Sequence, residues 1–214
     1  MIFLFKLISG EKMIERTLVL IKPDGVYRQL TGRVLTMFEE SGLKIVGMKL
    51  WKPKKEVVEK HYAADEKWMI SVGTKTKQSY QEKGVKVDKT ELEIGQEVRN
   101  ELLSYLTGKP TIALVLEGND AIYAVRKIIG GTEPRKADPS SIRGKFGTDS
   151  YEKADSEHRA VKNIVHASED KENAEREIYI WFEKDELLDY DIADAQYLWF
   201  FSFWFYFLIK FILW

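Results

Sequence analysis

The feature that most constrains the fold is an alternation of short apolar strands and amphipathic helices along the middle of the chain. Strands are expected at residues 16–22, 44–51 and 111–116, which are runs of β-branched and aliphatic residues. Helices are expected at about residues 31–42, 54–61, 95–106, 120–129 and 170–181. Strands joined by helices in mixed order, with short connections, predict one sheet with helices packed on one side. A ferredoxin-like β-α-β-β-α-β arrangement of the α+β class, with an antiparallel sheet, fits this order best.

Composition limits the class of protein. The 214 residues are 44% hydrophobic and 31% charged, which is typical of a soluble globular protein with one substantial core. The 33 Lys and Arg residues nearly cancel the 34 Asp and Glu residues, so there is no broad basic field for nucleic acid, and any phosphate affinity must be local. The chain has no cysteine, which excludes disulfides and thiolate chemistry. A cytoplasmic location is therefore expected.

The two ends depart from this pattern. Residues 1–13 form a short apolar leader of doubtful status, and Met13 is an alternative start. The main domain is expected at residues 14–184, followed by an extension over residues 185–214. Within that extension, residues 197–214 are almost purely aromatic and aliphatic, at the lower edge of the length of a transmembrane helix. Three interpretations remain open: an artefact of gene calling or an unstructured extension, a membrane tail or surface anchor, and an apolar segment buried between subunits.

Two segments interrupt the alternation inside the domain. Residues 68–88 contain two glycines and several lysines, and they are expected to form an inserted polar hairpin or loop. Residues 150–159 indicate a second, shorter insertion. No internal repeat accompanies them.

The segment Asn163–Ser168 is the first place to look for chemistry. It holds His166, one of only three histidines in the chain, and it precedes an acidic helix start that leads to Glu177. Histidine is the side chain whose unperturbed pKa lies near neutrality, so it can act as a nucleophile or base without much tuning. The helix that follows could return a carboxylate to the imidazole.

Five motifs in order carry a family resemblance. They are Lys22-Pro23-Asp24-Gly25, His61-Tyr62, Gly130-Gly131-Thr132-Glu133-Pro134, Ser141-Ile142-Arg143-Gly144-Lys145-Phe146 and Asn163-Ile164-Val165-His166-Ala167-Ser168. Any one of them alone is a weak signal, but together, over about residues 15–182, the chain resembles the nucleoside diphosphate kinase family. The insertion near Trp68 and the closing Ile180-Trp181-Phe182 look most like its archaeal, heat-adapted branch.

The resemblance implies a ping-pong phosphotransfer. A histidine takes the γ-phosphate of a nucleoside triphosphate on its pros nitrogen and passes it to a nucleoside diphosphate, and His166 matches that nucleophile. A phosphoryl transition state needs fixed donors around its oxygens, because charge is spread over them. The resemblance assigns this task to Lys22, Tyr62, Arg126, Thr132 and Arg143. Lysine meets a phosphate as a point charge, whereas arginine offers a planar fork.

Other family roles fall on polar residues around the nucleophile. Asn163 resembles the residue that hydrogen-bonds the sugar hydroxyls, and Lys22 is placed to reach them too. Glu177 corresponds to the carboxylate that orients the imidazole, with Ser168 in the same network. His61 and His158 are expected to have only structural or solvated roles.

The base pocket is where the sequence departs from the family. Lys67-Trp68-Met69-Ile70 stands where the family has a Pro-Phe-Phe segment, so Trp68 is a candidate for stacking on the base. Val161-Lys162 replaces a Gly-Arg pair, which keeps the charge and loses the fork. The preference for one base over another is therefore not predicted.

Metal, assembly and alternative functions complete the expectations. The sequence shows no His/Asp/Glu cluster with metal-site spacing and no P-loop, so Mg²⁺ is expected to arrive with the nucleotide rather than on protein ligands. The resemblance implies a homo-oligomer, hexamer or tetramer, that binds ATP and other nucleoside di- and triphosphates and no nucleic acid. The alternatives are a non-catalytic nucleotide-binding regulatory module and a protein-histidine phosphodonor, either of them tethered to a membrane by the tail.

Overall fold

A four-stranded antiparallel sheet forms the centre of the protein. The computed structural model describes residues 14–82 and 84–193, and the leader and the apolar segment 197–214 lie outside this part. The strands are β1 (Ile14–Ile21), β2 (Lys44–Trp51), β3 (Thr111–Asn119) and β4 (Val165–Ala167). Their order across the sheet is β2-β3-β1-β4, and every pair is antiparallel. The ferredoxin-like α+β fold expected from the alternation is confirmed.

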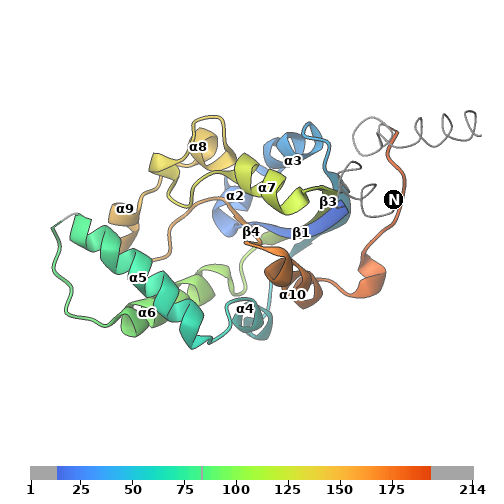
Figure 1. Ribbon diagram of the computed structural model, residues 1–214. Coiled ribbons are helices and arrows are strands. Elements are labelled where there is room, and N and C mark those ends of the chain that lie inside the picture. Colours follow the sequence, from blue (N-terminus) through green and yellow to red (C-terminus); the bar gives the residue numbers. More distant parts are fainter. Residues whose placement is uncertain (1–13, 83, 194–214) are drawn as a thin grey trace, which may run out of the picture.

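Two crossover helices cover one face of this sheet (Figure 1). They are α3 (Thr31–Glu39) and α7 (Ala121–Ile129). Phe38 of α3 and Val125 of α7 are buried against Val19 and Ile21 of β1 in one apolar cluster. Apolar residues that recur every three or four positions along both helices produce this contact, because they share one helix face.

The opposite face of the sheet is also covered, by helices that the prediction of one-sided packing did not include (Figure 1). These are α4 (Lys55–His61), α6 (Glu91–Leu106) and α10 (Lys171–Trp181). Leu18 and Leu20 of β1 lie in a second apolar cluster with Leu106 and Trp181. The two crossover helices therefore lie on one side of the sheet, as predicted, and the additional helices cover the other side. Successive residues of β1 are buried on alternate faces, which explains why this strand is apolar without interruption.

The segment around residues 68–88 was expected to be an inserted polar hairpin or loop, and most of it is helical rather than a loop. It contains most of α5 (Glu66–Glu82), which runs beside α6 as a helical hairpin (Figure 1). The two helices approach very closely at glycines. A Cβ atom on Gly73 would lie 1.7 Å from the carbonyl oxygen of Glu91, and one on Gly95 would lie 2.0 Å from that of Met69. Gly73 therefore marks a helix contact rather than a turn.

Short helices form the connections around one end of the sheet. They are α2 (Pro23–Tyr27), α8 (Ile142–Phe146), α9 (Tyr151–Ser156) and the 3₁₀ turn η1 (Pro134–Lys136). A second 3₁₀ turn, η2 (Lys184–Glu186), follows α10 and lies beside β2, where Glu186 accepts a hydrogen bond from Lys49. The second expected insertion, residues 150–159, contains α9. The Ser150 hydroxyl caps this helix by accepting the backbone N–H of Lys153.

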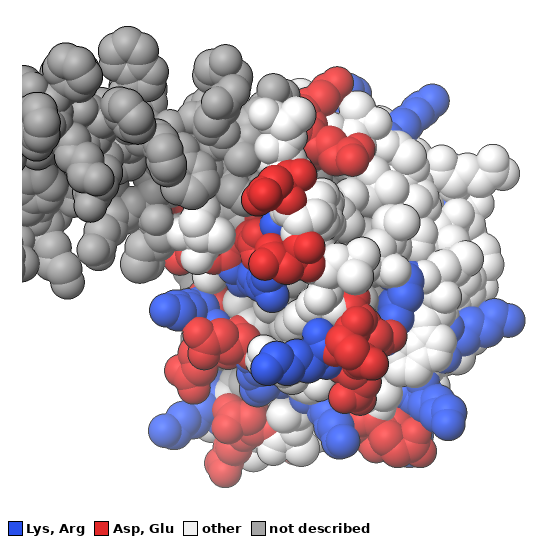
Figure 2. Space-filling model, turned by 90° about the vertical axis from the view of Figure 1, so that its right-hand side faces the viewer, with Lys and Arg blue, Asp and Glu red and all other residues white. Residues whose placement is uncertain are grey.

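The last described residues run along the outer edge of β2. The backbone N–H of Leu188 donates to the carbonyl of Val46 at 2.7 Å, and the Tyr190 hydroxyl donates to that of Ile45 at 2.7 Å. Among residues 14–82 and 84–193, no helix is long and apolar enough to cross a bilayer. Figure 2 shows acidic and basic side chains mixed over the lower part of one face, in keeping with the near balance of charges in the sequence.

Candidate active site

His166 is held by a carboxylate and a hydroxyl that the fold brings to it. It lies on β4, paired with Leu20 of β1, and its Nε2 atom is 3.0 Å from Oε2 of Glu177 on α10. The Ser168 hydroxyl donates to the same oxygen at 2.7 Å. An ionised carboxylate only accepts hydrogen bonds, so Nε2 carries the hydrogen. The Nδ1 atom of His166 is left as the nitrogen with a free lone pair.

Glu177 stays ionised in this setting. Burial opposes its ionisation, but the charge of His166 and the hydrogen bonds from His166 and Ser168 outweigh that effect and lower its pKa to about 2. The other oxygen, Oε1, lies 3.6 Å from a guanidinium nitrogen of Arg176. A negative charge is therefore fixed beside the imidazole at any working pH.

Lys22 and Asn163 form a buried polar chain at the carboxyl end of β1. Pro23 starts α2, so Lys22 is the residue before the first helical turn. Its Nζ atom donates to Oδ1 of Asn163 at 2.8 Å, and the Asn163 amide donates to the carbonyl of Thr132 at 3.0 Å. Burial, followed by the charge of Arg143, lowers the pKa of Lys22 to about 8. These two hydrogen bonds connect the segment after β1, the loop after α7 and the segment before β4.

Arg143 is buried next to this chain, on α8. Two of its guanidinium nitrogens donate to the carbonyls of Gly130 and Val165, each at 2.8 Å, so it ties the loop after α7 to β4. Within the described residues, its Nε atom is buried without a hydrogen-bond partner. Burial lowers the pKa of Arg143 to about 10, and the nearby charge of Arg126 adds to this. The guanidinium remains charged at neutral pH.

The remaining predicted residues lie around this centre with more exposure. Arg126 on α7 and Thr132 in the following loop are exposed, while Tyr62 at the end of α4 is buried. The ring centroid of Tyr62 is 6.4 Å from that of His166 and 6.2 Å from that of Trp68 on α5. Burial raises the pKa of Tyr62, so its hydroxyl is neutral. All nine predicted site residues therefore line one region, although Arg126 and Trp68 lie at its margin.

The backbone two residues before His166 is strained. Ile164 has a φ of 69°, a value in the left-handed region that a β-branched residue rarely adopts. Asp24 holds it there by accepting the N–H of Ile164 at 3.1 Å, and the Ile164 carbonyl accepts the N–H of Lys22 at 2.7 Å. The Tyr105 hydroxyl donates to Asp24. The sequence analysis did not include Asp24 or Tyr105 among the site residues, although Asp24 stands in the first motif.

His61, which was expected to have only a structural or solvated role, lies directly beside His166 and Glu177. Its ring is buried, with its centroid 4.6 Å from that of His166 and a nearly perpendicular orientation. The ligand atoms of His61, His166 and Glu177 all lie within 4.8 Å of one another, a grouping that spacing along the chain could not indicate. Hydrogen bonding already accounts for it, because Glu177 accepts from His166, and His61 accepts from Trp181. His158, by contrast, is exposed as expected.

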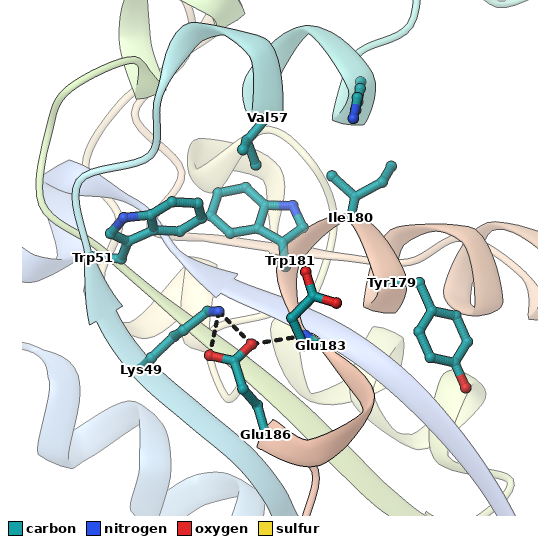
Figure 3. A pocket seen from close by; sticks show the side chains of 9 residues that line it. Lys49, Trp51, Val57, Tyr179, Ile180, Trp181, Glu183 and Glu186 are labelled. Atoms are coloured by element: carbon teal, nitrogen blue, oxygen red, sulfur yellow. Dashed lines mark hydrogen bonds and ion pairs between the residues drawn. The ribbon is translucent and has the colours of Figure 1, made fainter.

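A separate hollow is lined by Trp181, Trp51 and Val57, among others (Figure 3). It is lined by side chains of β2, α4, α10 and η2. Lys49 donates to both carboxylate oxygens of Glu186 at 2.8 Å across its lower part. None of the predicted site residues lines it.

Comparisons with known proteins agree with this geometry. The family model described as nucleoside diphosphate kinase matches residues 15–71 and 89–187. A nucleoside diphosphate kinase of Pyrobaculum aerophilum is 41% identical over 181 residues, which cover 82% of this chain and 99% of that protein. One from Pyrococcus abyssi is also 41% identical, over 84% of this chain and 91% of its own length.

Solved structures give the same result. The crystal structure of the Pyrobaculum aerophilum NDP kinase has a TM-score of 0.79 and 39% identity, and the match covers 83% of this chain and all of that one. A Borrelia burgdorferi nucleoside-diphosphate kinase, solved as a transition-state mimic with vanadate and ADP, has a TM-score of 0.72 and 31% identity, over 87% and 98% of the two chains. On the family model, the sequence identities and the fold, this chain belongs to the nucleoside diphosphate kinase family.

Proposed function

We propose that this protein transfers the γ-phosphate of a nucleoside triphosphate to a nucleoside diphosphate through a phosphohistidine on Nδ1 of His166. The observation that carries the assignment is the hydrogen bond between Nε2 of His166 and Glu177, which leaves Nδ1 as the free nucleophile. In the first half-reaction the Nδ1 lone pair bonds to the γ-phosphorus and the nucleoside diphosphate leaves. In the second, a terminal oxygen of another nucleoside diphosphate takes the phosphoryl group and the N–P bond breaks.

Glu177 stabilises the imidazole while the phosphoryl group is attached. As Nδ1 bonds to phosphorus the ring becomes positively charged, and the adjacent carboxylate lowers the energy of that charge. Because Ser168 and His166 share one carboxylate oxygen, the ring is fixed in orientation before a nucleotide binds. The same hydrogen bond between Glu177 and His166 is present when the phosphoryl group passes to the second nucleoside diphosphate.

The cationic side chains stabilise the phosphoryl oxygens. Lys22 and Arg143 are buried and fixed by hydrogen bonds, so they need little reorganisation when charge develops. The unpaired Nε of Arg143 is a buried donor whose desolvation a ligand oxygen would offset. Arg126, Thr132 and Tyr62 add donors from the margin of the site.

Asn163 and Lys22 serve the sugar, and Trp68 serves the base. The Asn163 amide and the Lys22 ammonium already bond to each other, and sugar hydroxyls can insert between them as both donor and acceptor. Trp68 offers a ring to stack on the base, which tolerates purines and pyrimidines because every base has a π-face.

Magnesium belongs to the nucleotide in this proposal. The predicted phosphate-binding side chains are cationic or neutral, whereas Mg²⁺ prefers carboxylate, phosphate and water oxygens. These side chains fit the phosphate oxygens of the substrate and would repel a free divalent cation. Mg²⁺ then neutralises charge on the phosphates when it enters with them.

Labelling tests the assignment. We expect the full-length protein, incubated with γ-labelled ATP, to form an acid-labile and alkali-stable phosphoenzyme that any nucleoside diphosphate discharges. His166→Ala should not become labelled, whereas the matched change at the exposed His158 should leave labelling intact. Labelling and transfer by His166→Ala would contradict the mechanism.

The same experiment separates the alternatives. A regulatory module that only binds nucleotide would not become labelled, and this is disfavoured because every predicted catalytic residue is present. A protein-histidine phosphodonor would become labelled but would discharge only to a protein acceptor.

Assembly and location remain proposals drawn from the family resemblance and the composition. We expect a cytoplasmic hexamer or tetramer, which light scattering on the purified protein would measure. Membrane association through residues 197–214 is tested by comparing the partition of the full chain with that of a chain ending near Tyr190. Recovery of both in the soluble fraction would end the anchor hypothesis.

A further inference from the structure

His61 and Trp181 form a contact that the phosphotransfer steps above do not use. The indole Nε1 of Trp181 donates to Nδ1 of His61 at 3.3 Å, and both rings are buried. The same Nδ1 atom lies 3.8 Å from Oε1 of Glu177. Figure 3 shows the Trp181 indole edge-on to Trp51, with its nitrogen on the side away from that ring. The indole nitrogen is therefore directed toward His61 rather than toward Trp51.

This contact determines where His61 carries its proton. An indole nitrogen is only a donor, so the Nδ1 atom that faces it must present a lone pair. Burial, followed by the charge of His166, lowers the pKa of His61 to about 3, so the ring is neutral and has a single N–H. That N–H must be on Nε2, which is buried without a hydrogen-bond partner in the described part of the chain. An unsatisfied buried donor is unfavourable.

The other tautomer would satisfy His61 better but would disturb Glu177. A proton on Nδ1 would point at Oε1 of Glu177, and a small movement from 3.8 Å would make a charge-assisted hydrogen bond. His61 would then share the carboxylate charge that now acts on His166 through Oε2. The Nδ1 atom cannot accept the Trp181 indole N–H and carry this proton at the same time.

We propose that Trp181 is a positioning residue that locks His61 in its Nε2–H tautomer and so reserves the charge of Glu177 for His166. The kinetic part of this inference rests on the proposed function, whereas the tautomer does not. The titratable and charged groups that face His61 are Lys22, Tyr62, His166, Arg176 and Glu177. Lys22 and Arg176 add positive charge and so keep the ring neutral.

Nitrogen NMR of the wild-type full chain, labelled with ¹⁵N-histidine, tests the tautomer directly. At neutral pH we expect His61 to show a protonated Nε2 and an unprotonated Nδ1, linked to the Trp181 indole N–H. A proton on Nδ1, or a charged ring at neutral pH, would overturn the proposal. This measurement requires neither a variant nor activity.

Variants test whether the tautomer of His61 affects the rate of phosphotransfer. In Trp181→Phe we expect the His61 proton to move to Nδ1 and kcat to fall about tenfold, with little change in KM. Trp51→Phe is the matched control, because it removes an indole that touches Trp181 but does not touch His61. It should keep both the tautomer and the rate.

The double variant separates a tautomer lock from simple packing. His61→Phe combined with Trp181→Phe removes the competing donor, so it should regain most of the rate lost in Trp181→Phe alone. A double variant as slow as the single one would overturn the lock. If Trp181→Phe does not fold, the wild-type tautomer decides the proposal. A wild-type protein that shows the Nε2–H tautomer but forms no phosphohistidine would contradict the proposed function and leave the tautomer assignment standing.

Discussion

The side of the site proposed to bind phosphate (the phosphate side) and the side proposed to bind the base (the base side) are built differently. On the phosphate side, Lys22, Arg143, Asn163 and Glu177 are all buried and each is fixed by hydrogen bonds to another loop or strand. The base side is formed by α5, α6 and α9, and its candidate ring, Trp68, is only partly buried.

The two additional segments on the side proposed to bind the base also contact each other. The Tyr80 hydroxyl of α5 hydrogen-bonds the Asp155 side chain of α9, so the long hairpin and the second insertion contact each other. Lys162, which stands in place of the family arginine, is exposed. The residues proposed to stabilise developing charge are therefore fixed by the fold, whereas the ring proposed for stacking is partly exposed. Changes on the two sides should therefore affect different kinetic constants.

The largest expected effect comes from the buried arginine. Arg143→Lys keeps the charge but loses the planar fork that bonds two carbonyls, so we expect kcat/KM to fall on the order of 100-fold or more. Arg126→Lys is the matched change at an exposed position, and it should lower kcat/KM by about tenfold at most. Steady-state kinetics of both variants provide the measurement. Equal losses would show that burial on the phosphate side does not matter.

The second-largest effect is expected from removing the charge of Glu177. Glu177→Gln is expected to lower kcat about 100-fold with little change in KM, because a neutral amide cannot stabilise the charge on the phosphorylated imidazole. Glu183→Gln, an exposed carboxylate just after the same helix, is the control. A normal kcat for Glu177→Gln, measured alongside this control, would remove Glu177 from the mechanism.

The pH dependence of kcat/KM tests the buried ammonium. Lys22 has its pKa lowered to about 8 in the free protein, so it is charged below that pH and loses its proton as the pH rises through it. We expect kcat/KM to fall above about pH 8, by up to tenfold per pH unit. In kcat the fall should occur at higher pH, because bound phosphate favours the charged form. A flat kcat/KM profile up to pH 10 would show that the Lys22 charge is not needed.

The smallest effect is expected on the base side. Trp68→Ala should raise KM about fivefold and leave kcat nearly unchanged, since stacking contributes about 1 kcal/mol and takes no part in the chemistry. Trp68→Phe should restore most of the affinity. A large fall in kcat instead would mean that the two sides of the site are coupled.

Local patterns predicted three of the four strands, the crossover helices and the set of candidate residues, but not β4, which is only three residues long. His166 could be found because its motif is short and contiguous, and Glu177 follows on the next helix. The roles of the site residues remain predictions. The helix over most of residues 68–88 was not predicted because glycines suggest turns, and only the approach of α5 to α6 shows that Gly73 permits helix packing.

The contacts around His61 could not be predicted from the sequence. Trp181 is 120 positions away from His61 along the chain. The residues next to a histidine in the sequence do not show whether it only packs in the core or contacts a functional site. Likewise, the strain at Ile164 depends on Asp24, 140 positions earlier.

The sequence alone determined the family, the α+β class and the side chains available for phosphotransfer, because these follow from local spacing and residue chemistry. Only the tertiary structure decided which atoms meet: Nε2 of His166 with Glu177, Lys22 with Asn163, and Trp181 with His61. The physical reason is that hydrogen-bond partners and burial are set by where the sheet and helices bring distant segments together. Those two quantities, rather than residue type, determine protonation and charge at the site.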